Sequence, residues 1–266
     1  MKNEKYFVAI IFVLLSFQNA SATANPILIT ISDDIDKVVF DGRWTFFSEW
    51  KHSSLNSIKY DANTVIQLRS AHQGNFIYVF VDVVPDVYLD KGADSAILCL
   101  DSDNNKNTLA DSDDYCFLAV LDGKSAFVYQ GGSPSRLNGN FKKIQPPSGF
   151  IGVGGVSDEN DRYSLTPHAG YEFRIPTDLV GRKDVYGVYL GVYDSHFNKV
   201  YSWPQDIQSS NLLQVPNPSM WGEMISPDKS LPEFPLSFLM LISAFSILIY
   251  ITKFSRARDI LTNYGK

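Results

Sequence analysis

The feature that most constrains this chain is a series of short segments rich in Val, Ile, Phe and Tyr, separated by Gly, Asn, Asp and Pro. Such segments predict β-strands, and none of them shows a convincing helical period. Residues 76–83 form a continuous apolar stretch (FIYVFVDV), which predicts a central strand covered on both faces. Further strands are predicted at residues 64–69, 95–101, 115–121, 125–130, 150–153, 171–175 and 185–193. The pattern predicts an all-β fold, an antiparallel β-sandwich.

The N-terminal residues 1–24 have the layout of an export signal. Lys2 and Lys5 precede an uncharged apolar stretch, and small residues follow it up to Ala24. We predict a secretory signal peptide, because the apolar stretch is shorter than a transmembrane helix requires. Residues 25–204 are then the exported β-sandwich, and the Pro-, Ser- and Asn-rich residues 205–234 are predicted to form a stalk.

Residues 235–252 carry no charge over a length that just crosses a bilayer, which predicts one C-terminal transmembrane helix. Lys253, Arg256 and Arg258 follow at once, and the positive-inside rule assigns residues 253–266 to a cytoplasmic tail. The large domain is therefore predicted to lie outside the cell, on a single-pass protein of the cell membrane. Residues 231–235 (LPEFP), the apolar span and the basic cluster also resemble archaeal PEF-type sorting tails. That resemblance implies removal of the helix after export, whereas a plain anchor explains the same residues.

The charge of the exported segment excludes one large class of partners. The chain has 23 Lys and Arg against 29 Asp and Glu, and of the acidic residues only Glu4 and Asp259 lie in the two terminal segments. The middle of the chain is therefore more acidic than the whole. An acidic surface repels nucleic acid, so no nucleic-acid partner is expected.

An acidic loop between two predicted strands is the strongest candidate for a metal site. Its sequence is DSDNNKNTLADSDD, at residues 101–114. Calcium takes six to eight oxygen ligands, and alternate side chains of a curling loop can point at one centre. The predicted ligands of a structural Ca²⁺ are Asp101, Asp103, Asn105, Asn107, Asp111 and Asp113. A solvated acidic turn without a cation is the alternative.

The two cysteines flank this loop symmetrically. If Asp101 opposes Asp114 in an antiparallel hairpin, Cys99 directly opposes Cys116. Directly opposed strand positions lie within disulfide range, and export supplies an oxidising compartment. We predict a Cys99–Cys116 disulfide, and two buried free thiols are the alternative.

Several short motifs occur in the order seen in family 9 carbohydrate-binding modules and their DOMON-like relatives. They are DG at 41–42, EW at 49–50, the strand 76–82, DSAIL at 94–98, EFRIP at 172–176 and GVYD at 191–194. The chain resembles this family over about residues 35–204. The resemblance implies an antiparallel β-sandwich with structural calcium and, in sugar-binding members, a sugar held between aromatic rings. Candidate sugar-binding residues are Trp44, Tyr201 and Trp203, whereas Trp50 is expected in the core.

The sequence departs from parts of the family pattern. Ile97 and Leu98 stand where many members carry an acidic residue, and no tryptophan pair that clamps a sugar can be placed. The DOMON-like haem carriers are disfavoured, because apart from Met1 every methionine lies at position 220 or later. The four histidines, His52, His72, His168 and His196, are interpreted as surface residues.

No catalytic motif is present: the sequence lacks His-Glu-x-x-His, Gly-x-Ser-x-Gly and a phosphate-binding loop. We therefore expect no enzyme. The predicted function is a cell-surface, calcium-stabilised carbohydrate-binding module that recognises a glycan or cell-envelope polymer. The alternative is a structural or adhesive envelope protein that binds a protein partner and no small ligand.

Overall fold

The structure is a computed structural model that describes residues 26–132, 140–205, 207, 211 and 214–227, with three further positions at 243, 245 and 246. The chain separates into two compact units, Met1–Ser226 and Pro227–Lys266. The predicted signal peptide lies outside the described residues, and so does the predicted transmembrane helix except at those three positions. In the part of the chain that is described, no helix is long and apolar enough to cross a membrane. Both segments therefore stay predictions.

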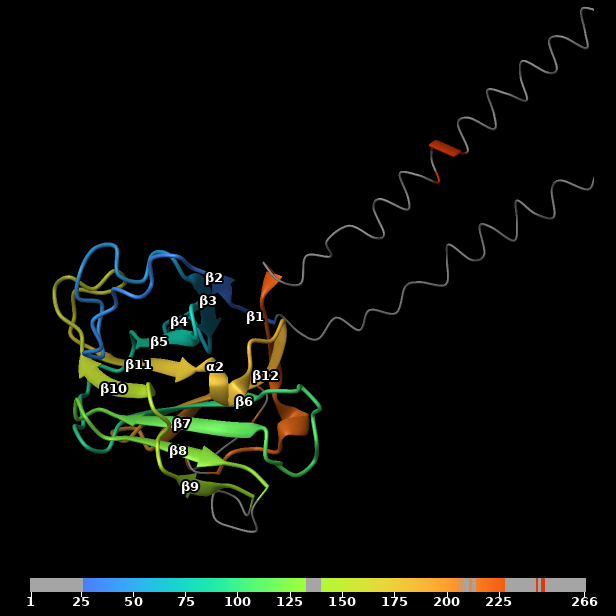
Figure 1. Ribbon diagram of the computed structural model, residues 1–266. Coiled ribbons are helices and arrows are strands. Elements are labelled where there is room, and N and C mark those ends of the chain that lie inside the picture. Colours follow the sequence, from blue (N-terminus) through green and yellow to red (C-terminus); the bar gives the residue numbers. More distant parts are fainter. Residues whose placement is uncertain are drawn as a thin grey trace, which may run out of the picture. The chain divides into compact units, whose positions relative to one another are not determined.

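The first unit is a sandwich of two β-sheets (Figure 1). The six-stranded sheet contains β10 (Ile151–Val156), β11 (Ala169–Pro176), β5 (Phe76–Val83), β4 (Val65–Gln73), β2 (Thr30–Ile31) and β3 (Ser54–Lys59). The eight-stranded sheet contains β1 (Ile27–Leu28), β14 (Gly222–Ile225), β12 (Val185–Asp194), β13 (Lys199–Trp203), β6 (Ser95–Asp101), β7 (Asp114–Val120), β8 (Ala126–Gln130) and β9 (Lys142–Ile144). A short helix, α2 (Thr177–Val180), follows β11, and a 3₁₀ turn (Pro218–Met220) precedes β14. The all-β prediction is confirmed for the described residues.

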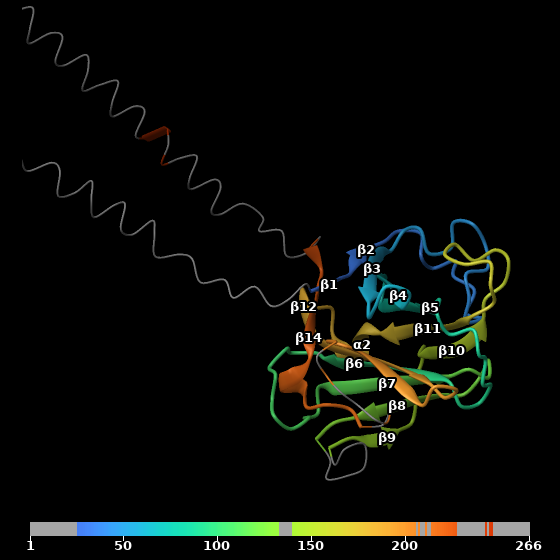
Figure 2. The same ribbon diagram turned by 180° about the vertical axis from the view of Figure 1, so that it is seen from behind.

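The pairing is antiparallel except at two short edge pairs, β1 with β14 and β2 with β4, which are parallel. Both exceptions come from one N-terminal segment that pairs first with one sheet and then with the other, as Figure 2 shows for β1 and β2. Ile29, between the two strands, is fully buried, and its amide donates to the Ile225 carbonyl at 2.9 Å. The segment therefore covers an open edge of each sheet. Without it, the backbone N–H and C=O groups of those edges would be unpaired and exposed.

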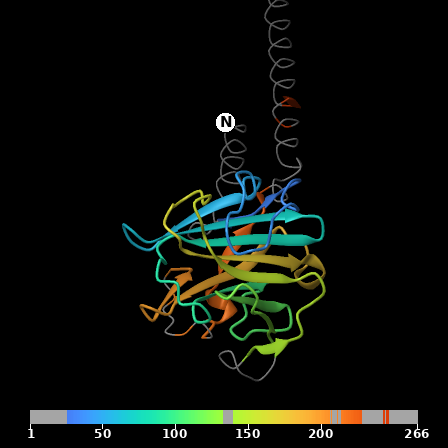
Figure 3. The same cartoon turned by 90° about the vertical axis from the view of Figure 1, so that its left-hand side faces the viewer.

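Three apolar layers explain why the central strands are buried on both faces. The main core lies between the sheets and includes Val79, Leu98 and Phe117. A second cluster, with Ile97 and Trp221, covers the outer face of the eight-stranded sheet. A third, on the outer face of the six-stranded sheet, lies beneath the loops that precede β3 and follow β10, which run together in Figure 3. The prediction of a two-face-covered strand at residues 76–83 is confirmed, and β5 has those bounds.

The predicted boundary at residue 204 is too early. Strand β14 pairs with β12 through residues 222–225, and Val215 and Trp221 are buried. The expected stalk at 205–234 therefore contributes its residues up to Ser226 to the sandwich unit. Strand β14 has only four residues, which is too few to show an alternation of apolar and polar residues in the sequence.

Candidate functional site

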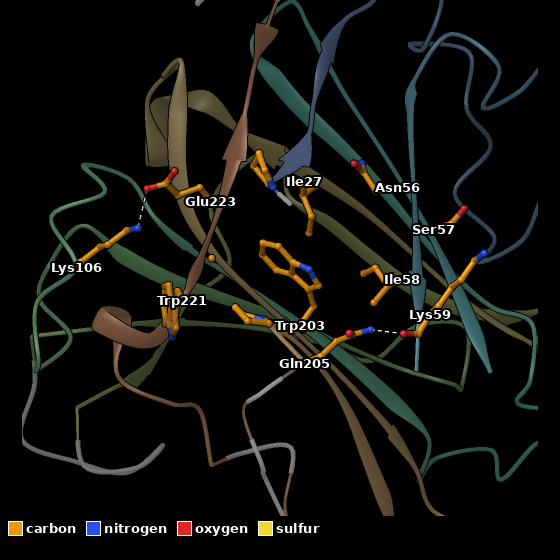
Figure 4. Close-up of a pocket in the computed structure, with 13 residues that line it drawn as sticks. Ile27, Asn56, Ser57, Ile58, Lys59, Lys106, Trp203, Gln205, Trp221 and Glu223 are labelled. Atoms are coloured by element: carbon orange, nitrogen blue, oxygen red, sulfur yellow. Dashed lines mark hydrogen bonds and ion pairs between the residues drawn. The ribbon is translucent and has the colours of Figure 1, made fainter. Parts of the chain in front are cut away.

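A pocket of about 680 Å³ lies where the edge strands of the two sheets face each other. Its walls come from β1, β3, β13 and β14, together with Lys106 of the acidic loop and Gln205. Figure 4 shows the indole of Trp203 in the middle of the pocket, between Ile27 and Ile58. A pocket of this size, with an aromatic surface and convergent polar groups, is suited to a small polar ligand.

Trp203 occupies this position because two strands share one side of β12. Strand β13 pairs with the C-terminal half of β12 and ends at Trp203, opposite Leu190. Strand β14 pairs with the N-terminal half and starts at Gly222, opposite Val188. The Trp203 ring lies against Gly222, where a Cβ atom would be only 2.1 Å from Cη2 of the indole. The ring remains partly exposed to the pocket.

Polar groups surround the indole. The Lys106 ammonium forms an ion pair with Glu223 at 2.7 Å, and the Gln205 amide donates to the Lys59 carbonyl, as Figure 4 shows. Asn56 exchanges two hydrogen bonds of 2.8 Å with the backbone of Leu28, which fixes its side chain between β3 and β1. The pocket therefore offers both donors and acceptors beside an apolar ring.

The other two candidate sugar-binding residues do not line this pocket. Tyr201 is only 7% exposed, and its ring packs edge-on against Tyr60 at 5.2 Å. Trp44 is 1% exposed, belongs to the cluster on the outer face of the six-stranded sheet, and donates from Nε1 to the Phe46 carbonyl at 2.6 Å. Tyr201 belongs to the main core between the sheets, and Trp44 to the cluster on the outer face. The expectation that Trp50 is buried is confirmed.

The acidic loop forms a carboxylate cluster, but with a different membership from the predicted one. Ligand atoms of Asp101, Asp113 and Asp114 lie within 4.8 Å of one another. Asp103 points instead to Lys183, with which it forms an ion pair of 2.7 Å. The amides of Asn105 and Asn107 donate to Asp111, at 3.1 and 2.7 Å. Of the six predicted ligands, the structure brings Asp101 and Asp113 into this cluster and adds Asp114.

The electrostatics of this cluster favour a cation. Burial, then the hydrogen bond with Asp111, raises the pKa of Asp113 to about 6, and the same hydrogen bond lowers the pKa of Asp111. Burial, reinforced by the neighbouring carboxylates, raises the pKa of Asp114 to about 7. Asp114 is fully buried, and its Oδ1 has no hydrogen-bond partner among the described residues. A hard divalent cation fits these oxygens, because it would coordinate Oδ1 of Asp114 and offset the repulsion between the carboxylates.

The register of the hairpin around this loop is the predicted one. Asp101 pairs with Asp114 and Cys99 pairs with Cys116. The two cysteines form a disulfide, and both side chains are fully buried. The disulfide prediction is confirmed, and the alternative of two free thiols is wrong.

Two histidines were misplaced by the sequence interpretation. His72 and His168 are fully buried rather than on the surface. His168 directly precedes β11, and its Nε2 lies 2.5 Å from Oδ1 of Asp82, a residue of the stretch that reads as apolar. Asp86 is a further buried carboxyl that sequence inspection missed, and burial, then repulsion from Asp94 and Asp194, raises its pKa to about 7. Buried side chains of this kind carry no local sequence signal, because their partners are distant in the chain.

No protein-family model matches the chain, and no curated protein matches it. Among solved structures, the chain is similar to a family 9 carbohydrate-binding module from Caldicellulosiruptor kristjanssonii in complex with cellotriose, with a TM-score of 0.47 and 17% identity over 79% of this chain and 100% of that chain. A structure of a family 9 module from the same organism in complex with glucose gives a TM-score of 0.48 and 17% identity, over 75% of this chain and 95% of that chain. At this level of likeness, neither complex assigns a ligand to the present chain.

Proposed function

We propose that the β-sandwich is a carbohydrate-binding module that holds a glycan or cell-envelope polymer in the pocket around Trp203. The observation that carries this proposal is the partly exposed indole at the centre of the pocket. An indole face provides flat apolar area on which the C–H groups of a pyranose can stack. Stacking on one ring binds a sugar without any bond being broken, so the proposed role is binding rather than catalysis.

The groups around the ring supply what stacking lacks. A sugar presents hydroxyl groups that both donate and accept, and the pocket places Glu223, Lys106 and Gln205 near the indole. The Lys106–Glu223 ion pair is a ready source of both roles, since the ammonium donates and the carboxylate accepts. Charge-assisted hydrogen bonds of this kind are stronger than neutral ones. The ligand expected from these groups is a neutral or weakly charged polyol.

A glycan array with the purified chain, followed by calorimetry on the best ligand, tests the proposal. Trp203→Ala is expected to weaken glycan binding strongly, because it removes the apolar aromatic face on which the sugar would stack. Phe197→Ala is the matched control, since Phe197 is an exposed aromatic, 58% accessible, that does not line the pocket. Equal glycan binding by Trp203→Ala and the unaltered chain would refute a site at this pocket. A blank array would refute carbohydrate binding.

The acidic loop is proposed to hold a structural Ca²⁺ through Asp101, Asp113 and Asp114. Besides its place in the cluster, Asp101 accepts the amides of Asn105 at 3.2 Å and Lys106 at 3.0 Å, so one side chain organises the loop. Chelation of calcium is expected to lower the melting temperature of the unaltered chain and to leave that of Asp114→Asn unchanged. An equal effect of chelation on both would place the calcium elsewhere.

The exported, membrane-anchored location also belongs to the proposal. The disulfide supports it, because such bonds persist in oxidising compartments. Protease treatment of intact cells is expected to digest the β-sandwich and to leave a membrane-protected C-terminal fragment. Complete protection of the sandwich in intact cells, with digestion after lysis, would contradict an extracellular position. A released sandwich without a C-terminal fragment would support removal of the predicted helix by a sorting enzyme.

A second candidate function, adhesion to a protein partner, is favoured by one surface feature. Tyr88 stacks face to face on His196 with ring centroids 4.0 Å apart, and Phe197 packs edge-on against both. Tyr88 and Phe197 are 49% and 58% exposed. Exposed aromatic groups of this kind are enriched at protein interfaces. A blank glycan array together with a partner lost in Phe197→Ala would favour adhesion over carbohydrate binding.

A further inference from the structure

A second cluster of ligand-type side chains lies under the loop that follows β10. His168, Asp82 and Asp161 each expose less than a tenth of their surface. Asp82 belongs to β5, whereas Asp161 and His168 belong to the segment between β10 and the start of β11. One ligand atom from each residue lies within 4.8 Å of the other two. The cluster is separate from the Trp203 pocket and from the acidic loop, and shares no residue with either.

The hydrogen bonds of His168 determine which ring nitrogen faces the carboxylates. Nδ1 lies 2.7 Å from the Thr166 carbonyl oxygen, which can only accept, and 2.9 Å from the Ser157 hydroxyl, so the tautomer with a proton on Nδ1 satisfies the shorter contact. Nε2 then faces Asp82 Oδ1 at 2.5 Å and Asp161 Oδ1 at 3.8 Å. A histidine whose Nδ1–H is held by a backbone carbonyl presents Nε2 in the orientation used by metal-binding histidines.

Two carboxylate oxygens in this cluster lack a partner. Oδ2 of Asp82 and Oδ2 of Asp161 are buried and accept no hydrogen bond from any described residue. The nearby Arg69 directs its hydrogen bonds elsewhere, to the Tyr163 hydroxyl at 2.9 Å and the Trp50 carbonyl at 3.0 Å. Buried carboxylate oxygens normally have partners, so these two indicate a group that completes the site.

We propose that Asp82, Asp161 and His168 bind a divalent transition metal of the zinc class. One imidazole nitrogen with carboxylate oxygens suits Zn²⁺ and its neighbours, whereas calcium sites use oxygen ligands alone. When the ion binds, it takes the Nε2 lone pair, and the proton that otherwise lies between Nε2 and Asp82 is released to solvent. Atoms that share one zinc ion lie about 3 Å apart, so the 2.5 Å contact widens slightly on binding.

The metal would link the loop between β10 and β11 to strand β5 of the six-stranded sheet. Asp161 accepts the amides of Tyr163 at 2.7 Å and Ser164 at 3.0 Å, and therefore orders the same loop that carries the ligands. Across this loop, Tyr163 packs edge-on against Trp44 with centroids 6.2 Å apart. Metal binding at this site is therefore expected to stabilise the cover of the third apolar cluster.

Zinc titration of the chelator-treated full chain tests this proposal, with Zn²⁺ itself as the probe and bound metal measured by elemental analysis. One zinc per chain is expected, with a rise in melting temperature. His168→Gln is expected to weaken that zinc binding by at least about 100-fold. Asp161→Asn serves as a second variant in case His168→Gln does not fold. Asp178→Asn, which makes the same change at an exposed position outside both carboxylate clusters, is the matched control and is expected to keep the zinc.

A spectroscopic measurement separates metal binding from a simple buried ion pair. Co²⁺ is expected to give a visible absorption band that is lost in His168→Gln and kept in Asp178→Asn. In nitrogen-detected NMR with excess Zn²⁺, Nε2 of His168 is expected to carry no proton. The proposal is overturned if Nε2 stays protonated under those conditions. It is also overturned if His168→Gln and Asp161→Asn bind as much zinc as the unaltered chain.

Discussion

The indole of Trp203 rests directly on the backbone of Gly222, so closely that a Cβ there would lie 2.1 Å from Cη2 and 2.4 Å from Cζ3. Real Cβ contacts do not reach such distances, and both backbone and ring would have to move. Gly222 is therefore part of the pocket, although it contributes no side chain to it. The position of the ring depends on a residue from a different strand of the same sheet edge.

Gly222→Ala is expected to displace the Trp203 ring and to weaken both glycan binding and the fold. Forcing a methyl group into a packed position costs about 1–3 kcal/mol. Calorimetric titration and thermal unfolding measure the two effects. Ser219→Ala, an exposed position three residues earlier, is the control and should change neither. Unchanged affinity in Gly222→Ala would show that the indole is not a binding surface.

Glu172→Gln is expected to loosen the loop that covers the outer face of the six-stranded sheet. The Glu172 carboxylate is fully buried and accepts the amides of Asp41 at 2.8 Å and Gly42 at 2.7 Å, and Nε1 of Trp50 at 3.0 Å. Burial raises the pKa of Glu172, while the hydrogen bonds from Gly42 and Trp50 oppose the rise. The side-chain amide of glutamine has one acceptor oxygen and one NH₂ group, and the NH₂ group leaves a buried donor without an acceptor. The expected loss is therefore about 2–3 kcal/mol of unfolding free energy.

Denaturant unfolding of Glu172→Gln measures this loss. Glu159→Gln, which makes the same change at an exposed position, is the control. A loss of similar size in both variants would mean that the three hydrogen bonds to Glu172 contribute nothing specific.

The stabilising effect of calcium is expected to grow between about pH 4 and pH 7. Asp113 and Asp114 have pKa values raised to about 6 and about 7, so the metal-free fold favours their protonated forms. Their contribution to metal-free stability is therefore fully present below the unfolded pKa near 3.8 and is lost as the pH rises through 6 to 7. Calcium needs the ionised forms and restores stability at the pH where the metal-free chain loses it.

Melting temperatures with calcium and with chelator, recorded across this pH range, check the sign. Asp114→Asn should flatten the pH dependence of the calcium effect. The melting temperature itself still varies with pH in both chains, because the pKa of Asp86 is also raised to about 7. A calcium effect that is equal at both ends of the range, or larger in acid, would contradict the assignment of these carboxyl groups as ligands.

Removal of the disulfide is expected to destabilise the sandwich by about 3 kcal/mol, because the bridge closes a loop with a sequence separation of 17 residues. The double variant Cys99→Ala, Cys116→Ala tests this by denaturant unfolding, and alanine avoids placing hydroxyl groups in the core. Reducing agent should lower the stability of the unaltered chain and leave the double variant unaffected. A double variant as stable as the oxidised chain would show that strand pairing alone holds the hairpin.

The features that depend on residues close together in the chain could be predicted before folding was known. Strand β5 and strand β6 have their predicted bounds, because long apolar stretches between turn residues leave little freedom. The pairing of Cys99 with Cys116 followed from the symmetry of the hairpin around the acidic loop. The disulfide prediction required only that the pairing of Asp101 with Asp114 be right.

Which residues form the sites depends on how the strands are arranged in the folded chain. Nothing local to Trp44 or Trp203 distinguishes them, yet Trp44 is sealed beneath a loop and Trp203 faces a pocket. Asp103 lies outside the carboxylate cluster and pairs instead with Lys183, which lies eighty positions further along the chain. A side chain's exposure and its partners depend on strands that meet only after folding, because contact energies act through space and not along the sequence.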